Sequence, residues 1–277
     1  MEYVELICHP SQGEHSADLL VGVLADAGFE SFTENENGTL SAFIQAPLFT
    51  HDLSSRLSSD EFSEFLDSFR VEHIADQNWN AVWESQYEPV LIDNRCMVRA
   101  PFHPQPAGLE FDIVIMPKMS FGTAHHETTK LMIQYLLSTE VSGKSLLDMG
   151  SGTAVLAILA RMKGALPVSA IDNDEWAYNN ALENVQSNNF AEIEVLLGDS
   201  SLLANKKYDI ILANINRNIL LNDIPVYCES LNAGGKLFMS GFYSEDLPLI
   251  EAKANETGLR IESNRIENNW TAACFTF

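Results

Sequence analysis

Hydrophobic residues in the first quarter of the chain alternate between the spacing of strands and that of helices. Residues 3–8 alternate as in a strand, and residues 19–27 place apolar side chains on one helical face that ends at Gly28. Two further strand-like runs, 30–33 and 39–45, are joined by asparagine and glycine residues typical of a turn. The sequence therefore begins with the order β-α-β-β.

A second amphipathic segment completes this unit and leads into a short strand at 71–74. Ser59 and Asp60 are the cap candidates. Behind them, hydrophobic residues recur at helical spacing: Phe62, Phe65, Leu66 and Phe69. The order β-α-β-β-α-β predicts a small ferredoxin-like α+β domain over residues 1–75. No catalytic group is visible in it.

Residues 76–89 form a predicted linker that contains a short helix. Trp79, Val82 and Trp83 would share one face of it, and we favour packing as the role of both tryptophans. Beyond the linker, short strands are expected at 90–92, 96–98 and 111–116.

From residue 145 onward the pattern becomes strand, turn and helix, repeated several times. Apolar strands that alternate with amphipathic helices predict a parallel sheet with helices on both faces. The last two strand-like runs, 259–266 and 271–277, flank Asn268 and Asn269 and predict an antiparallel hairpin that closes the sheet. The fold class is therefore α/β, Rossmann-like, over residues 90–277.

The composition is that of a folded soluble protein, with 46% hydrophobic residues in a chain of 277. The first residues lack the basic and apolar regions of a signal peptide, and no apolar run approaches the roughly 20 residues of a membrane span. We therefore expect a cytoplasmic protein. The 4 cysteines are scattered without a CxxC pair, which favours buried thiols over a zinc site or disulfides.

The net charge of the chain is −23, from 39 acidic and 16 basic residues. Such a charge repels phosphate backbones, so nucleic acid is not expected as a direct partner. The charge is explained first by solubility alone, and it also fits attraction of a basic protein substrate with an association rate that falls steeply with salt. Charge alone does not separate these two interpretations.

A glycine-rich turn follows the first strand of the α/β half. Gly150 and Gly152 allow a close backbone turn before a helix whose first N–H groups are free. A dinucleotide fingerprint would require a third glycine where Val155 stands, so the turn is weak evidence for NAD. Asp148 would also meet the pyrophosphate of NAD at close range, whereas the sulfonium and amino groups of S-adenosylmethionine are compatible with an acidic rim.

Acidic residues follow three successive strands of this half. After Asp148, Asp172 ends the second strand, where a carboxylate can accept hydrogen bonds from both ribose hydroxyls. Asp199 follows the third strand, and we expect it beside the adenine. Each acid alone is more often a cap or turn residue. Their recurrence at strand ends, together with the glycine turn, favours a nucleoside site.

Asn214 ends the fourth strand, where the transferred methyl group is expected. Its amide oxygen can accept a hydrogen bond from an attacking amine and orient the nitrogen lone pair. A cap for the helix that begins near residue 216 is an equally good local interpretation.

The stretch FGTAHHETT, residues 121–129, contains two adjacent histidines. The zinc motif H-E-x-x-H would need its second histidine where Lys130 stands, so no metal site is predicted. Adjacent histidines point in different directions, and we interpret the stretch as a glycine-bearing loop that runs into a helix. Thr128 and Thr129 would cap this helix or contact a ligand.

Four stretches together resemble the PrmA family, which methylates large-subunit ribosomal protein eleven: NWNAVWE at 78–84, FGTAHHETT at 121–129, LLDMGSGTAVLAI at 146–158 and LANI at 212–215. The resemblance covers most of the chain. It implies a class I methyltransferase domain, an amino-terminal domain that recognises the ribosomal protein, and a linker helix between them.

The resemblance also implies a donor, a product and a set of contacts. S-adenosylmethionine would be the donor and S-adenosylhomocysteine the product, and the methylated groups would be lysine side-chain amines and the terminal α-amine. The implied cofactor contacts are Thr129, Gly150, Asp172 and Asn214, with Phe121, Gly122 and Thr128 covering the methionine moiety.

The chain departs from the family pattern at four positions. Alanines stand at 124 and 154, where the family usually has glycine, so that Ala124 and Ala154 are expected to tighten the loop and the turn. Glu127 replaces a frequent proline, and Ser151 replaces a cysteine. Cofactor binding is still expected.

The predicted reaction is an in-line displacement by a neutral amine, in which catalysis is chiefly positioning. A lysine amine must first lose its proton, helped by desolvation beside a cationic cofactor, and no residue is identified as the base. We expect a monomer. Three alternatives stay open: a class I methyltransferase of another protein, one of a small or nucleic-acid amine, and a non-catalytic binding module. The absence of an N-P-P-[YF] tetrad argues against a nucleic-acid substrate.

Overall fold

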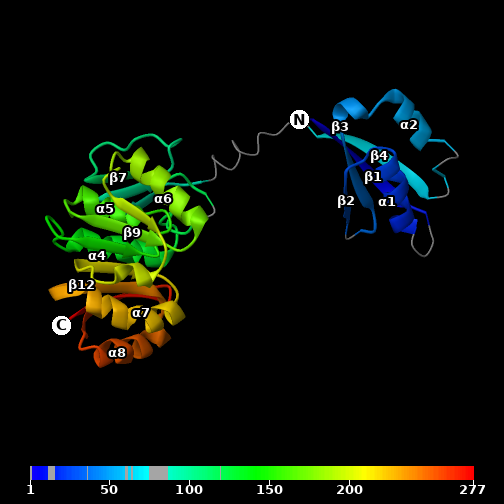
Figure 1. Cartoon of the computed structure of the whole chain (residues 1–277). Helices are drawn as coiled ribbons and strands as arrows, with labels where there is room; N and C mark the ends of the chain where they lie inside the picture. Colours follow the sequence, from blue (N-terminus) through cyan, green and yellow to red (C-terminus); the bar gives the residue numbers. More distant parts are fainter. Residues whose placement is uncertain are drawn as a thin grey trace. The chain divides into compact units, whose positions relative to one another are not determined.

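The chain divides into two compact units, residues 1–87 and 88–277, in a computed structural model (Figure 1). The structure describes residues 2–11, 16–35, 37–59, 62–63, 65–74, 87–118 and 120–277. Most of the predicted linker, including the helix expected around Trp79 and Trp83, lies outside these residues. No helix in the described part of the chain is long and apolar enough to cross a membrane.

The described residues of the first unit form an antiparallel sheet with two helices. Its sheet has the order β2-β3-β1-β4. Along the chain the strands and helices follow the predicted order β-α-β-β-α-β, with a 3₁₀ turn at Ala46–Leu48. Their bounds are β1 (Tyr3–Pro10), α1 (Ser16–Asp26), β2 (Ser31–Glu34), β3 (Leu40–Gln45), α2 (His51–Leu57) and β4 (Leu66–Ile74).

The position predicted for the second helix of this unit is wrong. The helix lies upstream, where Thr50 Oγ1 accepts a hydrogen bond from the Leu53 N–H at 3.2 Å. Leu66 and Phe69 instead belong to β4, which pairs along β1. Phe62 and Leu66 are both buried in the core of the unit, so their spacing imitates a helical face. Tertiary pairing with β1 decides the conformation.

The second unit contains a seven-stranded sheet of order β10-β9-β8-β11-β12-β14-β13. Pairings along β10, β9, β8, β11 and β12 are parallel, and β14 runs antiparallel to both of its neighbours. The strand bounds are β8 (Leu146–Met149), β9 (Val168–Asp172), β10 (Glu194–Leu197), β11 (Tyr208–Asn214), β12 (Leu231–Tyr243), β13 (Arg260–Glu267) and β14 (Trp270–Thr276). The predicted parallel sheet and closing hairpin are confirmed.

Helices cover both faces of this sheet (Figure 1). One buried apolar cluster packs α4, α5 and α6 against the sheet, and a second packs α7 and α8 against the opposite face. The helix bounds are α4 (Glu127–Ser138), α5 (Val155–Met162), α6 (Glu175–Ser187), α7 (Arg217–Ser230) and α8 (Leu247–Glu256). A three-stranded sheet of β5 (Val90–Ile92), β6 (Cys96–Arg99) and β7 (Phe111–Val114) precedes them, close to the predicted bounds.

The antiparallel direction of β14 matters for the site. Its first residue, Trp270, pairs with Tyr243, the last residue of β12. The beginning of β14 therefore lies at the edge of the sheet where the parallel strands end.

Candidate functional site

A cavity of about 560 Å³ lies at the carboxyl ends of the parallel strands. We call it the main cavity. Its size is within the range of small-molecule sites, and its position is the one at which open α/β sheets bind ligands. Six of the residues predicted from the sequence line it: Phe121, Thr128, Gly150, Gly152, Asp172 and Asn214.

The carboxylate of Asp172 is fixed at one end of the main cavity. One oxygen accepts the Gly152 N–H at 2.8 Å, and the other accepts the Asp174 N–H at 3.0 Å. A carboxylate has about four lone-pair positions, so each oxygen keeps the capacity to accept a further hydrogen bond. Asp172 therefore orders the glycine turn and still offers two acceptors to a ligand.

The two glycines of the turn are required by close contacts as well as by backbone conformation. Gly150 has φ of +68° and Gly152 has φ of +54°. A Cβ at position 150 would lie 2.0 Å from Ile215 Cγ2, and one at position 152 would lie 2.3 Å from the Phe121 carbonyl oxygen. A side chain at either position would push the turn away from its neighbours.

Ala154 shows that a left-handed conformation alone does not require glycine in this turn. It has φ of +62° and a fully buried side chain at the start of α5, where the resemblance described above implies glycine. Ala124 is similar, with φ of +67° and a buried methyl group. Both methyl groups are therefore accommodated within the packed loops.

Asn214 displays an unsatisfied oxygen. Its Nδ2 donates to Thr129 Oγ1 at 3.4 Å, and its Oδ1 is buried without a hydrogen-bond partner among the described residues. The alternative role as a helix cap belongs to Asn216, whose Oδ1 accepts the Ile219 N–H at 3.2 Å. A buried polar atom without a partner is costly, so a ligand is the natural partner for the Asn214 oxygen.

The loop before α4 is fastened to the glycine turn. Thr153 donates its backbone N–H to the Phe121 carbonyl at 3.0 Å and its hydroxyl to the Gly122 carbonyl at 2.7 Å. Gly122 thus supports the cavity wall without lining it, and Thr129 does so through Asn214.

The two adjacent histidines point in different directions, as predicted. His126 lines the main cavity and caps α4, because its Nδ1 accepts the Thr128 N–H at 3.3 Å. His125 instead lies 3.0 Å, through Nε2, from the Glu88 carbonyl oxygen.

The structure does not bring Asp148 and Asp199 into the lining of the main cavity. Asp148 is buried, and its Oδ2 accepts the Ala157 N–H at 3.1 Å. Burial raises the pKa of Asp148 to about 8, and the nearby Asp172 adds to the rise. Asp148 is therefore a buried acid that supports α5, and its expected contact with the cofactor stays a prediction. Asp199 is an exposed cap that accepts the Ser201 N–H at 2.9 Å, and its contact with adenine stays a prediction.

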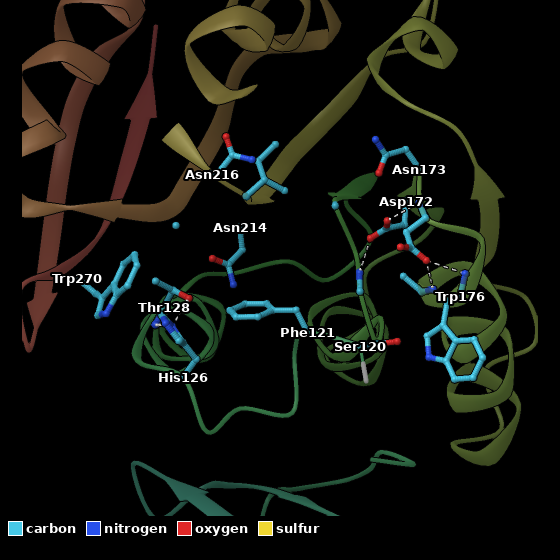
Figure 2. A pocket seen from close by; sticks show the side chains of 16 residues that line it. Ser120, Phe121, His126, Thr128, Asp172, Asn173, Trp176, Asn214, Asn216 and Trp270 are labelled. Carbon is cyan, nitrogen blue, oxygen red and sulfur yellow. Dashed lines mark hydrogen bonds between the residues drawn. The ribbon is translucent and has the colours of Figure 1, made fainter. Parts of the chain in front are cut away.

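Two tryptophans at the ends of the main cavity were missed by the sequence analysis. Trp176, in the first turn of α6, is 56% exposed and lies beside Asp172, at the right of Figure 2. Trp270 lies at the left with His126 and Thr128, and its ring meets that of His126 edge-on at 4.6 Å. The antiparallel closing hairpin was a signal for Trp270, because it brings the start of the last strand to this edge.

Polar contacts hold the hairpin that carries Trp270. Asn268 donates to the Glu127 carboxylate at 2.9 Å, and this bond is the main reason that the pKa of Glu127 is lowered. Trp270 also packs on Tyr243, with 4.1 Å between ring centroids. Glu127 thus connects the start of α4 to the hairpin.

The charges of the main cavity favour a cationic ligand. Asp172 and Asp174 line it, and no lysine or arginine does so in the described parts of the chain. A pyrophosphate would meet carboxylates there without a compensating positive charge. A nucleoside that carries a positive charge fits better.

Comparison with known proteins decides the family. The family model described as ribosomal protein L11 methyltransferase (PrmA) matches residues 13–277. The chain belongs to this family. The resemblance predicted from four short stretches is thereby confirmed.

Similar proteins cover nearly the whole chain. The ribosomal protein L11 methyltransferase of Bacteroides fragilis is 45% identical over an alignment of 280 residues that covers 99% of each chain. That of Porphyromonas gingivalis is 45% identical over 266 residues, 95% of this chain and 91% of the other. The crystal structure of a ribosomal protein L11 methylase from Lactobacillus delbrueckii subsp. bulgaricus is 28% identical with a TM-score of 0.63, and it covers 69% of this chain and 98% of that one.

The main cavity fits the cofactor of PrmA methyltransferases, S-adenosylmethionine. Asp172 offers two acceptors of the kind that ribose hydroxyls require, and the glycine turn leaves no room for side chains. Among the described residues the oxygen of Asn214 has no partner and no lysine or arginine lines the cavity, which agrees with a ligand that carries positive charge. The turn also accommodates Ala154, one of the residues that prompted the non-catalytic alternative, with φ of +62° and a fully buried side chain.

Proposed function

We propose that this chain transfers methyl groups from S-adenosylmethionine to amines of ribosomal protein L11, the large-subunit protein eleven named above. The acceptors are lysine side chains and the terminal α-amine. The observation that carries the proposal is that two different hydrogen-bond acceptors lie at separate places in the main cavity. Asp172 offers carboxylate oxygens at one end, and farther along it Asn214 offers a buried oxygen that has no partner among the described residues.

Different residues of the main cavity hold different parts of the methyl donor. Asp172 accepts hydrogen bonds from the ribose hydroxyls, and Gly150 and Gly152 let the backbone of the turn approach the donor closely. Trp176 presents a flat apolar face to the adenine. Phe121 and Thr128 cover the methionine portion. When bound, S-adenosylmethionine supplies an electrophilic methyl group on a positively charged sulfur.

On the acceptor side, Asn214 positions the amine. Its Oδ1 accepts an N–H from a neutral amine and thereby fixes the direction of the nitrogen lone pair. Thr129 keeps the amide from rotating by accepting its Nδ2–H. Trp270 and His126 form an aromatic wall at this end. Desolvation by that wall favours the neutral form of the amine.

The remaining roles follow from the organisation of the chain. Residues 1–75 recognise the ribosomal protein, residues 76–89 link the two parts, and residues 90–277 carry out the transfer. A net charge of −23 attracts a basic ribosomal protein and repels nucleic acid. The protein works in the cytoplasm as a monomer.

The test is incubation of the full chain with methyl-labelled S-adenosylmethionine and a complete extract of ribosomal proteins. We expect one labelled band, at the position of L11, and peptide mass spectra with methylated lysines and a methylated amino terminus. A different labelled band would indicate another protein substrate. No labelled band, despite measurable cofactor binding, would indicate a binding module without turnover.

A further inference from the structure

A second cavity, of about 610 Å³, adjoins the main cavity. Asn216, Gly241 and Trp270 line both, so the two lie next to each other, and both Asn216 and Trp270 appear in Figure 2. A polypeptide that places one amine beside Asn214 must continue away from it along the surface. The second cavity offers a path for the neighbouring residues.

The charges of the second cavity leave one free carboxylate. Arg217 is the basic residue in its described lining, and its guanidinium binds Asp246 at 2.6 Å. Asp246 is largely buried, and its other oxygen accepts the Tyr243 N–H at 3.4 Å. Glu245, in the 3₁₀ turn Ser244–Asp246, is exposed, and its carboxylate makes no hydrogen bond or ion pair with any residue that the structure describes. The cavity therefore has a net negative charge that is not neutralised from within.

Aromatic side chains form the wall that the two cavities share. Tyr243 and Trp270 lie with ring centroids 4.1 Å apart and planes inclined by 35°. Tyr243 is 42% exposed, so its ring is accessible from the second cavity. Aromatic faces attract ammonium and guanidinium groups and pack against their aliphatic stems.

We infer that the second cavity binds a positively charged side chain of the substrate, close in sequence to the amine that is methylated. This inference rests on the proposed function. The aliphatic stem lies along Tyr243 and Trp270, and the charged head reaches Glu245. The enzyme therefore selects target amines that have a basic neighbour, and Glu245 is the specificity-determining residue.

The test uses the full-length protein, its Glu245→Gln variant and Glu229→Gln as the matched control. Glu229 is exposed near the end of α7, and its carboxylate has no partner among the described residues. It lies 12 residues beyond Arg217, or roughly 18 Å along the helix axis. The two variants therefore remove the same charge from different places.

The substrates are L11 itself and short peptides with one target lysine. Each peptide carries one arginine, placed at one of the three positions before or the three positions after the lysine. Glutamine fills the remaining positions. For the unmodified protein and Glu229→Gln, we expect arginine in at least one position to lower KM about three- to tenfold, the range of an exposed ion pair with a cation–π contact. Glu245→Gln should lose this preference and raise KM for L11.

Each contrary result has a distinct meaning. Equal KM values of Glu245→Gln and Glu229→Gln for every substrate would overturn the inference while leaving the proposed function in place. A preference for glutamate in the peptides would assign the cavity to an anion held by Arg217 and would also overturn it. Failure of the unmodified protein to methylate L11 would refute the proposed function, and the inference with it.

Discussion

Asn214 at the end of β11 and Thr129 in the first turn of α4 are joined by a hydrogen bond of 3.4 Å from Nδ2 to Oγ1. The two residues are 85 positions apart in the chain. Because the amide nitrogen is engaged, the amide oxygen is left as the free group, buried and without a partner in the described structure. The pair thus presents an acceptor in the main cavity.

Replacement of Asn214 by alanine should slow methyl transfer without abolishing cofactor binding. We expect kcat with L11 to fall about 100-fold, because the amine loses the acceptor that orients it. The Kd for S-adenosylhomocysteine, measured by calorimetry, should change by less than about threefold. Asn216→Ala is the comparison for a capping role, since it should lower the free energy of unfolding by about 1 kcal/mol. Normal turnover of Asn214→Ala would remove Asn214 from the reaction.

Asp172→Ala should abolish measurable cofactor binding while the fold persists. Two charge-assisted hydrogen bonds, of roughly 1.5–3 kcal/mol each, are lost to the ribose, which corresponds to an affinity at least about 100-fold lower. Asp67→Ala, which removes an exposed carboxylate of β4, should leave the affinity unchanged. Circular dichroism checks that both variants fold. Unchanged affinity of Asp172→Ala would mean that the nucleoside binds elsewhere.

Gly152→Ala and Gly143→Ala separate close contact from backbone strain. Both glycines have positive φ, +54° and +70°, but a Cβ at 143 meets nothing within 4 Å, whereas one at 152 would lie 2.3 Å from the Phe121 carbonyl oxygen. Each substitution should lower the free energy of unfolding by about 1 kcal/mol through strain. Only Gly152→Ala should also weaken cofactor binding, by at least tenfold in calorimetry. Equal affinities of the two variants would contradict the packing of the turn.

Asp148 should make stability fall as pH rises. Its pKa is raised to about 8 in the folded protein, against about 3.9 in an unfolded chain, so between these values unfolding releases a proton. The difference in unfolding free energy between the unmodified protein and Asp148→Asn should therefore decrease by up to about 1.4 kcal/mol per pH unit from pH 5 to 8. Denaturant unfolding at several pH values measures this. A difference independent of pH would show that Asp148 is ionised when folded.

The sequence contained most of the fold of the second unit. Its strands and helices follow strong local periodicity, and the closing hairpin was visible from Asn268 and Asn269, which adopt φ of +46° and +69°. The first unit was harder. Around Phe62 and Leu66 the burial pattern is that of a helix, but the backbone of Leu66 pairs with β1, a partner distant in sequence. Local spacing carries no information about such pairing.

The candidate site was predictable where it depended on strand ends. Asp172 and Asn214 follow strands directly, so their position follows from the order of the sheet. The burial of the Asp148 side chain was not predictable in this way, because it depends on how α5 packs. Trp176 and Trp270 were missed, since an aromatic residue near a turn is usually part of a core until the tertiary structure shows otherwise.

A crystal structure of the protein with S-adenosylhomocysteine tests most directly whether the main cavity is shaped for a sulfur nucleoside. We expect both ribose hydroxyls within hydrogen-bond distance of the Asp172 carboxylate, the adenine against Trp176 and the sulfur on the side of Asn214. An empty cavity at saturating ligand, or a nucleoside whose ribose lies away from Asp172, would contradict the site and the transfer chemistry built on it.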